Sequence, residues 1–560
     1  MPHETTVWNL YGAGLERLGR DGRPETVVVP EPGAGELLVR PDAVGLCFSD
    51  TKIVRLGSDH PKLQGRDFAV DPVRLGHEVC LTVMAVGVGL EDRFRVGQRL
   101  ALQPDIYRGG VSTAYGYTIP GGLATLQLLG PDVLDNEGLT YVFEAHEGLS
   151  AAAVALTEPW ACVISAYTQR RRLQPLSGGR AWVHLAGPDD VHADLAGFGA
   201  FDGAAEVLVT GSGDAEAVRA SLSRWGRAAD AGAVDVAPGP PEGATYDDIV
   251  LVGAVPAVDV AAALRRLRAR GLCVLLRSDE LADPVAVDVG RLHYDYIAVV
   301  GTASGDLEAA LGAERNRCEL RPGGVCVVVG AAGPMGQMHI QYALEHEAGP
   351  HTIVATDVDR ARLDFLTQRF AGLATARGID LRVIEAGPGG DVGAVVAAAS
   401  DGRGADDVIM VAAFPGLIAE ADAWLADGGM LVMFAGLPRG TEVPVRLGRV
   451  PRAGIQYTGT SGSTIEDHQR VLALAAAGRL DPVRSLAAVA GLKAVPESLA
   501  ALLEGTYAGK VVVLPQVPDL PLQSIEELAA ARPDVAAALG PDGRWTQAAE
   551  DLLTKGRPGA

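Results

Sequence analysis

The stretch of chain that most constrains the fold runs from Gly324 to Gly336 and reads GVCVVVGAAGPMG. Its residues 325–329 are apolar or β-branched and predict a short, buried parallel strand, and a helical pattern follows the glycines. Small residues in such a turn let the backbone approach a pyrophosphate, and the N-terminus of the next helix offers unpaired N–H groups. The turn residues predicted to bind a dinucleotide are Gly330, Gly333, Pro334, Met335 and Gly336.

A second predicted strand, residues 353–356, leads into Asp357, which follows Gly336 by 21 residues. A carboxylate at this point of a dinucleotide-binding fold accepts hydrogen bonds from the adenosine ribose. Strand, turn, helix, strand and acid in this order therefore predict dinucleotide binding over the alternative, an α/β turn that holds no phosphate. Asp357 favours NAD because it would repel a 2′-phosphate, while Arg360 and Arg362 keep NADP open.

Residues 323–489 alternate predicted strands with helical stretches, which indicates an open, doubly wound parallel sheet of the Rossmann type. Ligands of such sheets bind at the carboxyl ends of the strands. We therefore expect the nicotinamide half of the cofactor near Ala412, Gly436 and Thr460, each of which follows a predicted strand.

The middle of the chain, residues 177–322, resembles this domain closely enough to be a second copy of it. The segment YDDIVLV at 246–252 matches ADDVIMV at 405–411, and the offset stays at 158–159 through the latter half of the unit. In the first half the offset is near 146. The sequence therefore predicts two tandem Rossmann-type domains.

The first of these copies lacks the binding features of the second. Asp189 and Asp190 stand where the other copy has Met335 and Gly336, and carboxylates at a helix N-terminus repel a phosphate. Gly211 stands where an acid should align. We expect this degenerate copy to bind no dinucleotide. It could act as an internal partner that covers a sheet edge, making an intrachain pseudo-dimer, or it could be an inert insertion or a docking surface.

Composition narrows the class of protein. The chain has 560 residues, 48% of them hydrophobic, and a formal charge of −22, which argues against nucleic acid or anionic membranes as partners. Its six cysteines form no C-x-x-C pair, and neither a signal peptide nor a membrane-spanning apolar run is evident. These features predict a soluble, cytoplasmic protein.

Residues 1–176 contain short β-branched runs punctuated by glycine, which predicts a compact, twisted β-rich domain. Within it, Cys47, His77, Glu78 and Glu158 offer a thiolate, an imidazole and carboxylates, the ligand types of a catalytic zinc site. Each also has a structural explanation, as a core thiol, a turn histidine or a helix-end charge. Occurring together beside a dinucleotide site, they favour zinc.

The order Gly-x-Cys-x-Ser-Asp, Gly-His-Glu, Glu-Pro and then a glycine turn resembles the medium-chain dehydrogenase/reductase superfamily, in its zinc-dependent polyol branch. The resemblance covers residues 1–176 and 323–514. It implies a β-rich, GroES-like catalytic zinc domain (1–176 and 490–560) and the NAD-binding Rossmann domain (323–489). The internal repeat adds the degenerate Rossmann-like domain (177–322), so the predicted fold class is α/β.

The resemblance also implies roles for single residues. Cys47 and His77 would bind one catalytic zinc, and whether Glu78, Glu158 or both also bind it is left open. Ser49 would relay the proton of the substrate hydroxyl, and Asp50 would orient the ligands. No structural zinc is expected, because no cysteine occurs between Cys80 and Cys162.

The function predicted is hydride transfer between NAD(H) and a secondary alcohol or ketone of a polyol or sugar. Lys52 and Lys62, two of only five lysines, flank His60 after Cys47, which suggests either a phosphorylated substrate or simply a solvated loop. An epimerase or lyase without net redox change and a non-catalytic scaffold or sensor are the alternatives. The sequence leaves a homo-oligomer open.

Overall fold

The computed structural model describes residues 2–187, 190, 197–211, 233–237, 239–277, 281–387 and 390–554. The chain forms two compact units. Unit 1 comprises Met1–Ser165, Gly333–Met338 and Gly462–Ala560, and unit 2 comprises Ala166–Ala332 and His339–Ser461. Residues 462–489, which the sequence assigned to the NAD-binding domain, therefore belong to unit 1. The predicted three-domain boundaries themselves stay a prediction.

The described residues of unit 1 form an eight-stranded sheet in the order β26-β24-β25-β3-β4-β5-β9, with β8 paired to β3. Its strands are β3 (Leu37–Gly45), β4 (Glu78–Val86), β5 (Arg99–Leu102), β8 (Gln127–Leu129), β9 (Val142–Glu144), β24 (Leu486–Gly491), β25 (Lys510–Leu514) and β26 (Gln523–Ser524). The strand expected near the carboxyl end of the chain, β25, pairs with β3 and so completes the amino-terminal domain.

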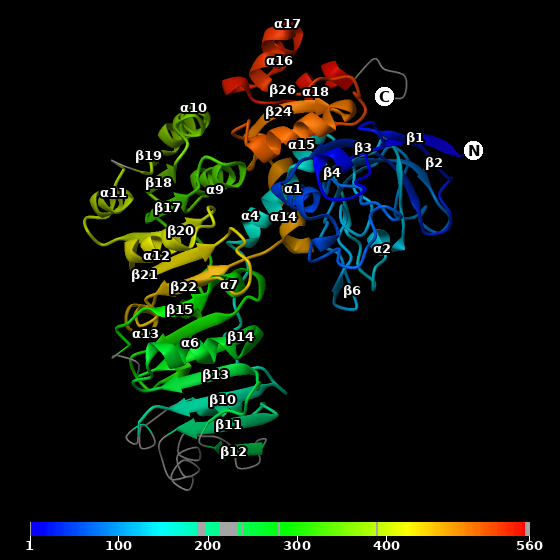
Figure 1. The fold of residues 1–560 in the computed structure, drawn as a ribbon. Helices are drawn as coiled ribbons and strands as arrows, with labels where there is room; N and C mark the ends of the chain where they lie inside the picture. Colours follow the sequence, from blue (N-terminus) through cyan, green and yellow to red (C-terminus); the bar gives the residue numbers. More distant parts are fainter. Residues whose placement is uncertain are drawn as a thin grey trace. The chain divides into compact units, whose positions relative to one another are not determined.

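Helices and short strands cover this sheet of unit 1. The helices are α1 (Phe48–Leu56), α2 (Pro131–Leu134), α3 (Ala151–Ala155), α4 (Thr157–Ser165), α14 (Ile465–Ala476), α15 (Val495–Glu504), α16 (Ile525–Ala531), α17 (Pro533–Ala538) and α18 (Gln547–Thr554). The further strands are β1 (His3–Val7), β2 (Glu25–Val29), β6 (Tyr107–Arg108) and β7 (Val111–Ser112). Figure 1 shows α14 beside α4, a contact that ties residues 465–476 to unit 1.

In the part of the chain that the structure describes, unit 2 contains two six-stranded parallel sheets with one strand order, β12-β11-β10-β13-β14-β16 and β19-β18-β17-β20-β21-β23. The first sheet has β10 (Arg180–Leu185), β11 (Glu206–Gly211), β12 (Ala233–Ala237), β13 (Tyr246–Val252), β14 (Leu267–Leu276) and β16 (Ala298–Thr302). The second has β17 (Val325–Val329), β18 (Thr352–Asp357), β19 (Asp380–Glu385), β20 (Ala405–Met410), β21 (Leu425–Met433) and β23 (Gln456–Gly459). When the strands of each sheet are renumbered from one in chain order, both sheets have the order 3-2-1-4-5-6, which is the Rossmann arrangement. The predicted α/β fold class is therefore confirmed.

The helices of unit 2 flank these sheets (Figure 1). They are α6 (Ala257–Arg265), α7 (Val289–Tyr294), α8 (Leu307–Ala310), α10 (Arg360–Arg377), α11 (Val392–Ala399), α12 (Pro415–Trp424) and α13 (Arg449–Ala453). Helix α9 (Pro334–Glu345) is divided, with its residues up to Met338 in unit 1 and the rest in unit 2. No helix among the described residues is long and apolar enough to cross a membrane.

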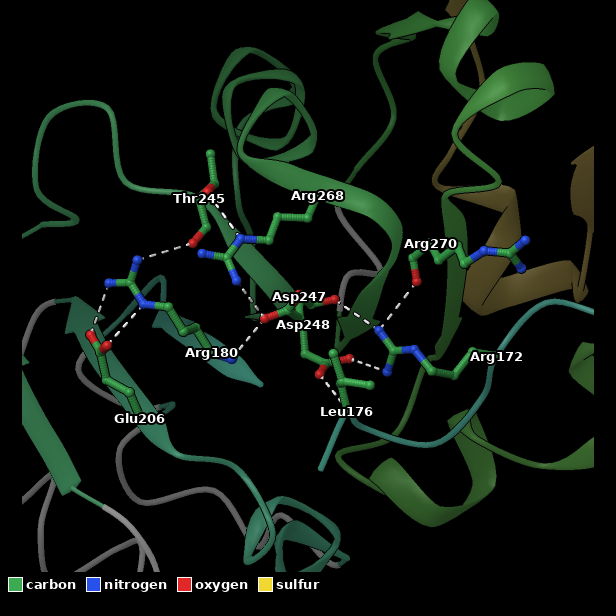
Figure 2. Close-up of polar contacts among 9 residues, drawn as sticks. All are labelled: Arg172, Leu176, Arg180, Glu206, Thr245, Asp247, Asp248, Arg268 and Arg270. Atoms are coloured by element: carbon green, nitrogen blue, oxygen red, sulfur yellow. Dashed lines mark hydrogen bonds and ion pairs between the residues drawn. The ribbon is translucent and has the colours of Figure 1, made fainter. Parts of the chain in front are cut away.

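An arginine–aspartate network fixes the start of the fourth strand in both copies. In the degenerate copy, Arg172 Nη1 donates to Asp248 Oδ1 at 2.7 Å and the Leu176 amide to Asp248 Oδ2 at 2.8 Å, as Figure 2 shows. In the other copy Arg317 Nη1 donates to Asp407 Oδ1, and the Arg321 amide donates to Asp407 Oδ2 at 2.7 Å. Because the donors and acceptors correspond one to one, the two sheets are structural repeats.

The two copies also meet through equivalent positions. Strand β15 (Val285–Asp288) pairs antiparallel with β22 (Glu442–Val445), and Ala286 lies opposite Pro444. These two positions differ by 444 − 286 = 158 residues, the offset of the repeat. A residue that pairs with its own counterpart indicates a local two-fold relation, as in an isologous interface. The edge strands β16 and β23 lie beside each other at the same junction.

Candidate active site

Three metal-binding side chains come together in unit 1. Gly45 at the end of β3 pairs with Glu78 at the start of β4, and Cys47 follows as the N-cap of α1. This register brings Cys47 to His77 and Glu78, and one ligand atom from each lies within 4.8 Å of the others. A Cβ at Gly45 would lie 2.1 Å from Glu78 Oε2, so the carboxylate fits only against a glycine.

Asp50 orients this group from the first turn of α1. Its side chain is fully buried, Oδ2 accepts a hydrogen bond from the Cys47 amide at 2.9 Å, and Oδ1 lies 3.3 Å from His77 Nδ1. Burial alone would lower the pKa of His77, but the Asp50 carboxylate outweighs it and raises the pKa well above its usual value. The other ring nitrogen, Nε2, lies 3.3 Å from Ser49 Oγ.

Glu78 is held by a residue that the sequence did not single out. Lys510 Nζ, on β25, donates to Glu78 Oε1 and to the Leu46 carbonyl, the latter at 3.1 Å. The side chains of both ions are buried, with 4% of Lys510 and none of Glu78 exposed. The sequence signal for such a buried charge was the lysine that begins the otherwise apolar run KVVVL at 510–514.

Glu158, near the start of α4, is buried but lies outside the group of three. Burial is the main cause that raises its pKa to about 8, while His77 lowers the pKa and Glu78 raises it. Its Oε1 lies 3.9 Å from the thiol of Cys162. Glu158 is therefore within electrostatic reach of the other ligand candidates.

The donor set fits a divalent metal. Among the described residues Glu78 Oε2 is buried without a hydrogen-bond partner, an arrangement that is costly unless a further group binds there. A half-buried cysteine, a buried imidazole and a buried carboxylate in one group match the ligand types of catalytic zinc, which leaves a position for water or substrate.

Unit 2 has a cavity of about 630 Å³ at the carboxyl ends of β17 to β20. Gly330, Asp357 and Ala412 all line it. Gly330 adopts a φ of 81°, and a Cβ there would lie 2.9 Å from the Ala412 amide nitrogen. The cavity lies where the strand order reverses between β17 and β20, the usual ligand position in open α/β sheets.

The remaining predicted cofactor residues border three other elements, α9, β21 and β23. Gly333 precedes α9, and Pro334, Met335 and Gly336 are its first three residues. Gly436 follows β21 and Thr460 follows β23, and neither lines the cavity.

Asp357 lies at the end of β18, as the sequence predicts. Its Oδ2 accepts from the Ala332 amide at 3.1 Å and its Oδ1 from the Val358 amide at 2.8 Å. In the degenerate copy Asp190, which aligns with Gly336, accepts a hydrogen bond at Oδ2 from the Gly187 amide at 2.9 Å. Asp189 lies outside the described residues.

Comparison with known proteins agrees with this architecture. Residues 33–131 match the alcohol dehydrogenase GroES-like domain family. L-sorbose 1-phosphate reductase of Klebsiella pneumoniae is 25% identical over 552 residues, which cover 98% of this chain and 97% of that one. Mannitol-1-phosphate 5-dehydrogenase of Aliivibrio fischeri is 24% identical over 513 residues, 91% of this chain and 88% of that one. These relatives, matched over nearly their full length, support the resemblance of the chain to the medium-chain dehydrogenase/reductase superfamily.

Within this superfamily the matches support the polyol branch, and they identify the chain as an oxidoreductase. Among solved structures, 2R,3R-butanediol dehydrogenase from Bacillus subtilis has a TM-score of 0.52 at 15% identity, covering 91% of this chain and 99% of that one. At this identity the likeness shows the fold alone.

Proposed function

We propose that the protein is a zinc- and NAD(H)-dependent dehydrogenase that interconverts a secondary alcohol and a ketone on a polyol or sugar. The observation that carries the proposal is the group of half-buried Cys47 with buried His77 and Glu78, in a chain that also has a cavity at the switch point of a Rossmann sheet. The polyol and sugar names of the relatives support the substrate class.

Cys47, His77 and Glu78 would hold the zinc, with Glu158 as the further candidate ligand. When bound, zinc lowers the pKa of an alcohol and polarises a ketone. Asp50 keeps the imidazole of His77 oriented, and Ser49 Oγ would accept the hydroxyl proton and pass it to solvent. A bound NAD⁺ would supply the hydride acceptor, so that alcohol and NAD⁺ would give ketone, NADH and a proton.

A phosphorylated substrate is the finer proposal. Lys62 Nζ lies 5.0 Å from the Tyr117 ring centroid and 3.5 Å from Asp105 Oδ1. Burial is the main cause that lowers the pKa of His60. The positive charges of Lys62 and Lys52 lower this pKa further, so both ammonium groups act on the His60 ring. Two cations beside the metal-ligand loop suit a phosphate, and two relatives are named for 1-phosphate substrates.

NAD is the proposed cofactor, because Asp357 would repel a 2′-phosphate. For the degenerate copy we propose the role of an internal partner. The pairing of β15 with β22 supports this pseudo-dimer, since the two strands occupy equivalent positions of the two copies, as in an isologous interface.

The test is a zinc-loaded sample offered polyols and ketose phosphates with NAD or NADH, followed through the absorbance of NADH. We expect NADH formation with a polyol and consumption with the matching ketose, and zinc near one ion per chain. Substrate turnover without net formation or consumption of NADH would indicate an epimerase or lyase instead. Absence of both bound metal and turnover would indicate a non-catalytic scaffold.

A further inference from the structure

Tyr296 adopts a backbone conformation that bulky residues avoid. Its φ is 54°, in the left-handed region, and Gly454, 158 residues later at the equivalent position of the second copy, has a φ of 67°. A side chain at such a position costs conformational energy that glycine does not incur, and strain of this kind persists where the surroundings hold it. The degenerate copy thus has a tyrosine where its counterpart has a glycine, which adopts this conformation without strain.

Arg270 repeats this exchange next to Tyr296. It has a φ of 60°, and its counterpart at the same offset is Gly428, with a φ of 70°. The guanidinium of Arg270 lies 5.1 Å from the centroid of the Tyr296 ring, and that of Arg171 lies 5.2 Å from it. Two cations over one ring fix its position.

The hydroxyl of Tyr296 holds the loop that follows β23 in the NAD-binding copy. It donates to the Ser461 carbonyl at 2.7 Å and accepts from the Ser461 amide at 3.0 Å. On the other side of Thr460, the buried Arg171 Nη2 donates to the Gly459 carbonyl. Both neighbours of Thr460 are therefore bonded to Tyr296 or to the arginine that packs on it.

The loop after β21 is held from the same copy. His293 Nδ1 donates to the Met433 carbonyl at 3.0 Å. A Cβ at Gly436 would lie 2.4 Å from the Tyr294 hydroxyl oxygen, so the backbone passes directly against that side chain. Two of the three loops predicted to receive the nicotinamide thus contact residues between His293 and Tyr296 of the degenerate copy.

We propose that the degenerate copy, through a clamp formed by Tyr296, Arg171 and Arg270, positions the 459–461 loop for the nicotinamide half of the cofactor. Tyr296 is a positioning residue in this arrangement, because it acts on the cofactor through Ser461 and its neighbour Thr460. The inference rests on the proposed function, since it needs a nicotinamide at this edge of the sheet. The degenerate copy, which has no phosphate-binding turn of its own, would then help to position the cofactor of the NAD-binding copy.

The test compares Tyr296→Phe with Tyr246→Phe. Both changes remove one hydroxyl from the degenerate copy, and Tyr246 Oη is buried without a hydrogen-bond partner among the described residues. Loss of the Ser461 hydrogen bonds should weaken NADH binding about 5- to 30-fold in Tyr296→Phe, whereas ADP-ribose, which lacks the nicotinamide, should bind within about twofold of the unaltered protein. Tyr246→Phe should bind both ligands unchanged.

Amide hydrogen exchange of residues 456–464 gives a second measurement that needs no ligand. We expect faster exchange in Tyr296→Phe alone. Unchanged exchange, unchanged NADH affinity, or an equal loss for NADH and ADP-ribose would each overturn the inference. If the unaltered protein bound neither ligand, the proposed function would fall and the cofactor role of Tyr296 with it, while faster exchange would still show that Tyr296 holds Ser461.

Discussion

The Lys510–Glu78 ion pair gives the sharpest prediction for stability. Nζ and Oε1 are 2.5 Å apart and both side chains are almost fully buried. At an effective dielectric constant of about 20 their attraction is about 7 kcal/mol, from which the desolvation of two ions must be subtracted. Lys510→Met keeps the chain length and removes the charge, and a buried ion left without its partner costs about 3–5 kcal/mol. We expect that loss in the free energy of unfolding of the metal-free protein.

Urea unfolding of three variants would measure this loss. Lys493→Met is the matched control, since Lys493 pairs with Asp519 at 2.8 Å with 66% of each side chain exposed, and should cost less than about 1 kcal/mol. The double variant Lys510→Met, Glu78→Gln should recover part of the loss because no buried charge is then unpaired. If Lys510→Met unfolds at the same urea concentration as Lys493→Met, the pair does not stabilise the unit and the reasoning is refuted.

Three further predictions concern the site itself. Cys47→Ala should abolish zinc content and turnover while NADH affinity changes by less than about twofold; retained zinc in a metal assay would contradict it. Asp357→Ala should weaken NADH binding by roughly tenfold, because one charge-assisted hydrogen bond is lost. A binding titration should also show a smaller ratio of NADH affinity to NADPH affinity. Gly45→Ala should destabilise the protein by about 1–3 kcal/mol, because the new Cβ would lie 2.1 Å from Glu78 Oε2, and unchanged thermal unfolding would count against that contact.

The Rossmann sheets were predictable because their signals are local. The strand at 325–329, its glycine turn and Asp357 lie within one short stretch, and the repeat offset reveals the second copy directly. Cys47, His77 and Glu78 were predictable as a group from their ligand types, and the structure brings them together. Glu158 stays a prediction as a ligand.

Other parts depend on contacts that no local pattern encodes. Lys510 reaches Glu78 across 432 residues of chain, because β25 returns to pair with β3. The left-handed conformation of Tyr296 is also hidden, since only glycine signals that region reliably. The repeat offset does hold a clue, because it aligns Tyr296 with Gly454 and Arg270 with Gly428.

The two copies share contacts at the amino ends of their strands and differ at the carboxyl ends. At the amino ends, Arg172 and Asp248 repeat the contacts of Arg317 and Asp407, and these contacts hold the sheet together (Figure 2). At the carboxyl ends, where ligands bind, Asp190 Oδ2 of the degenerate copy accepts from the Gly187 amide. The proposed internal partner needs the degenerate copy only to fold and to pair β15 with β22, so it requires the contacts at the amino ends and no phosphate turn at the carboxyl ends.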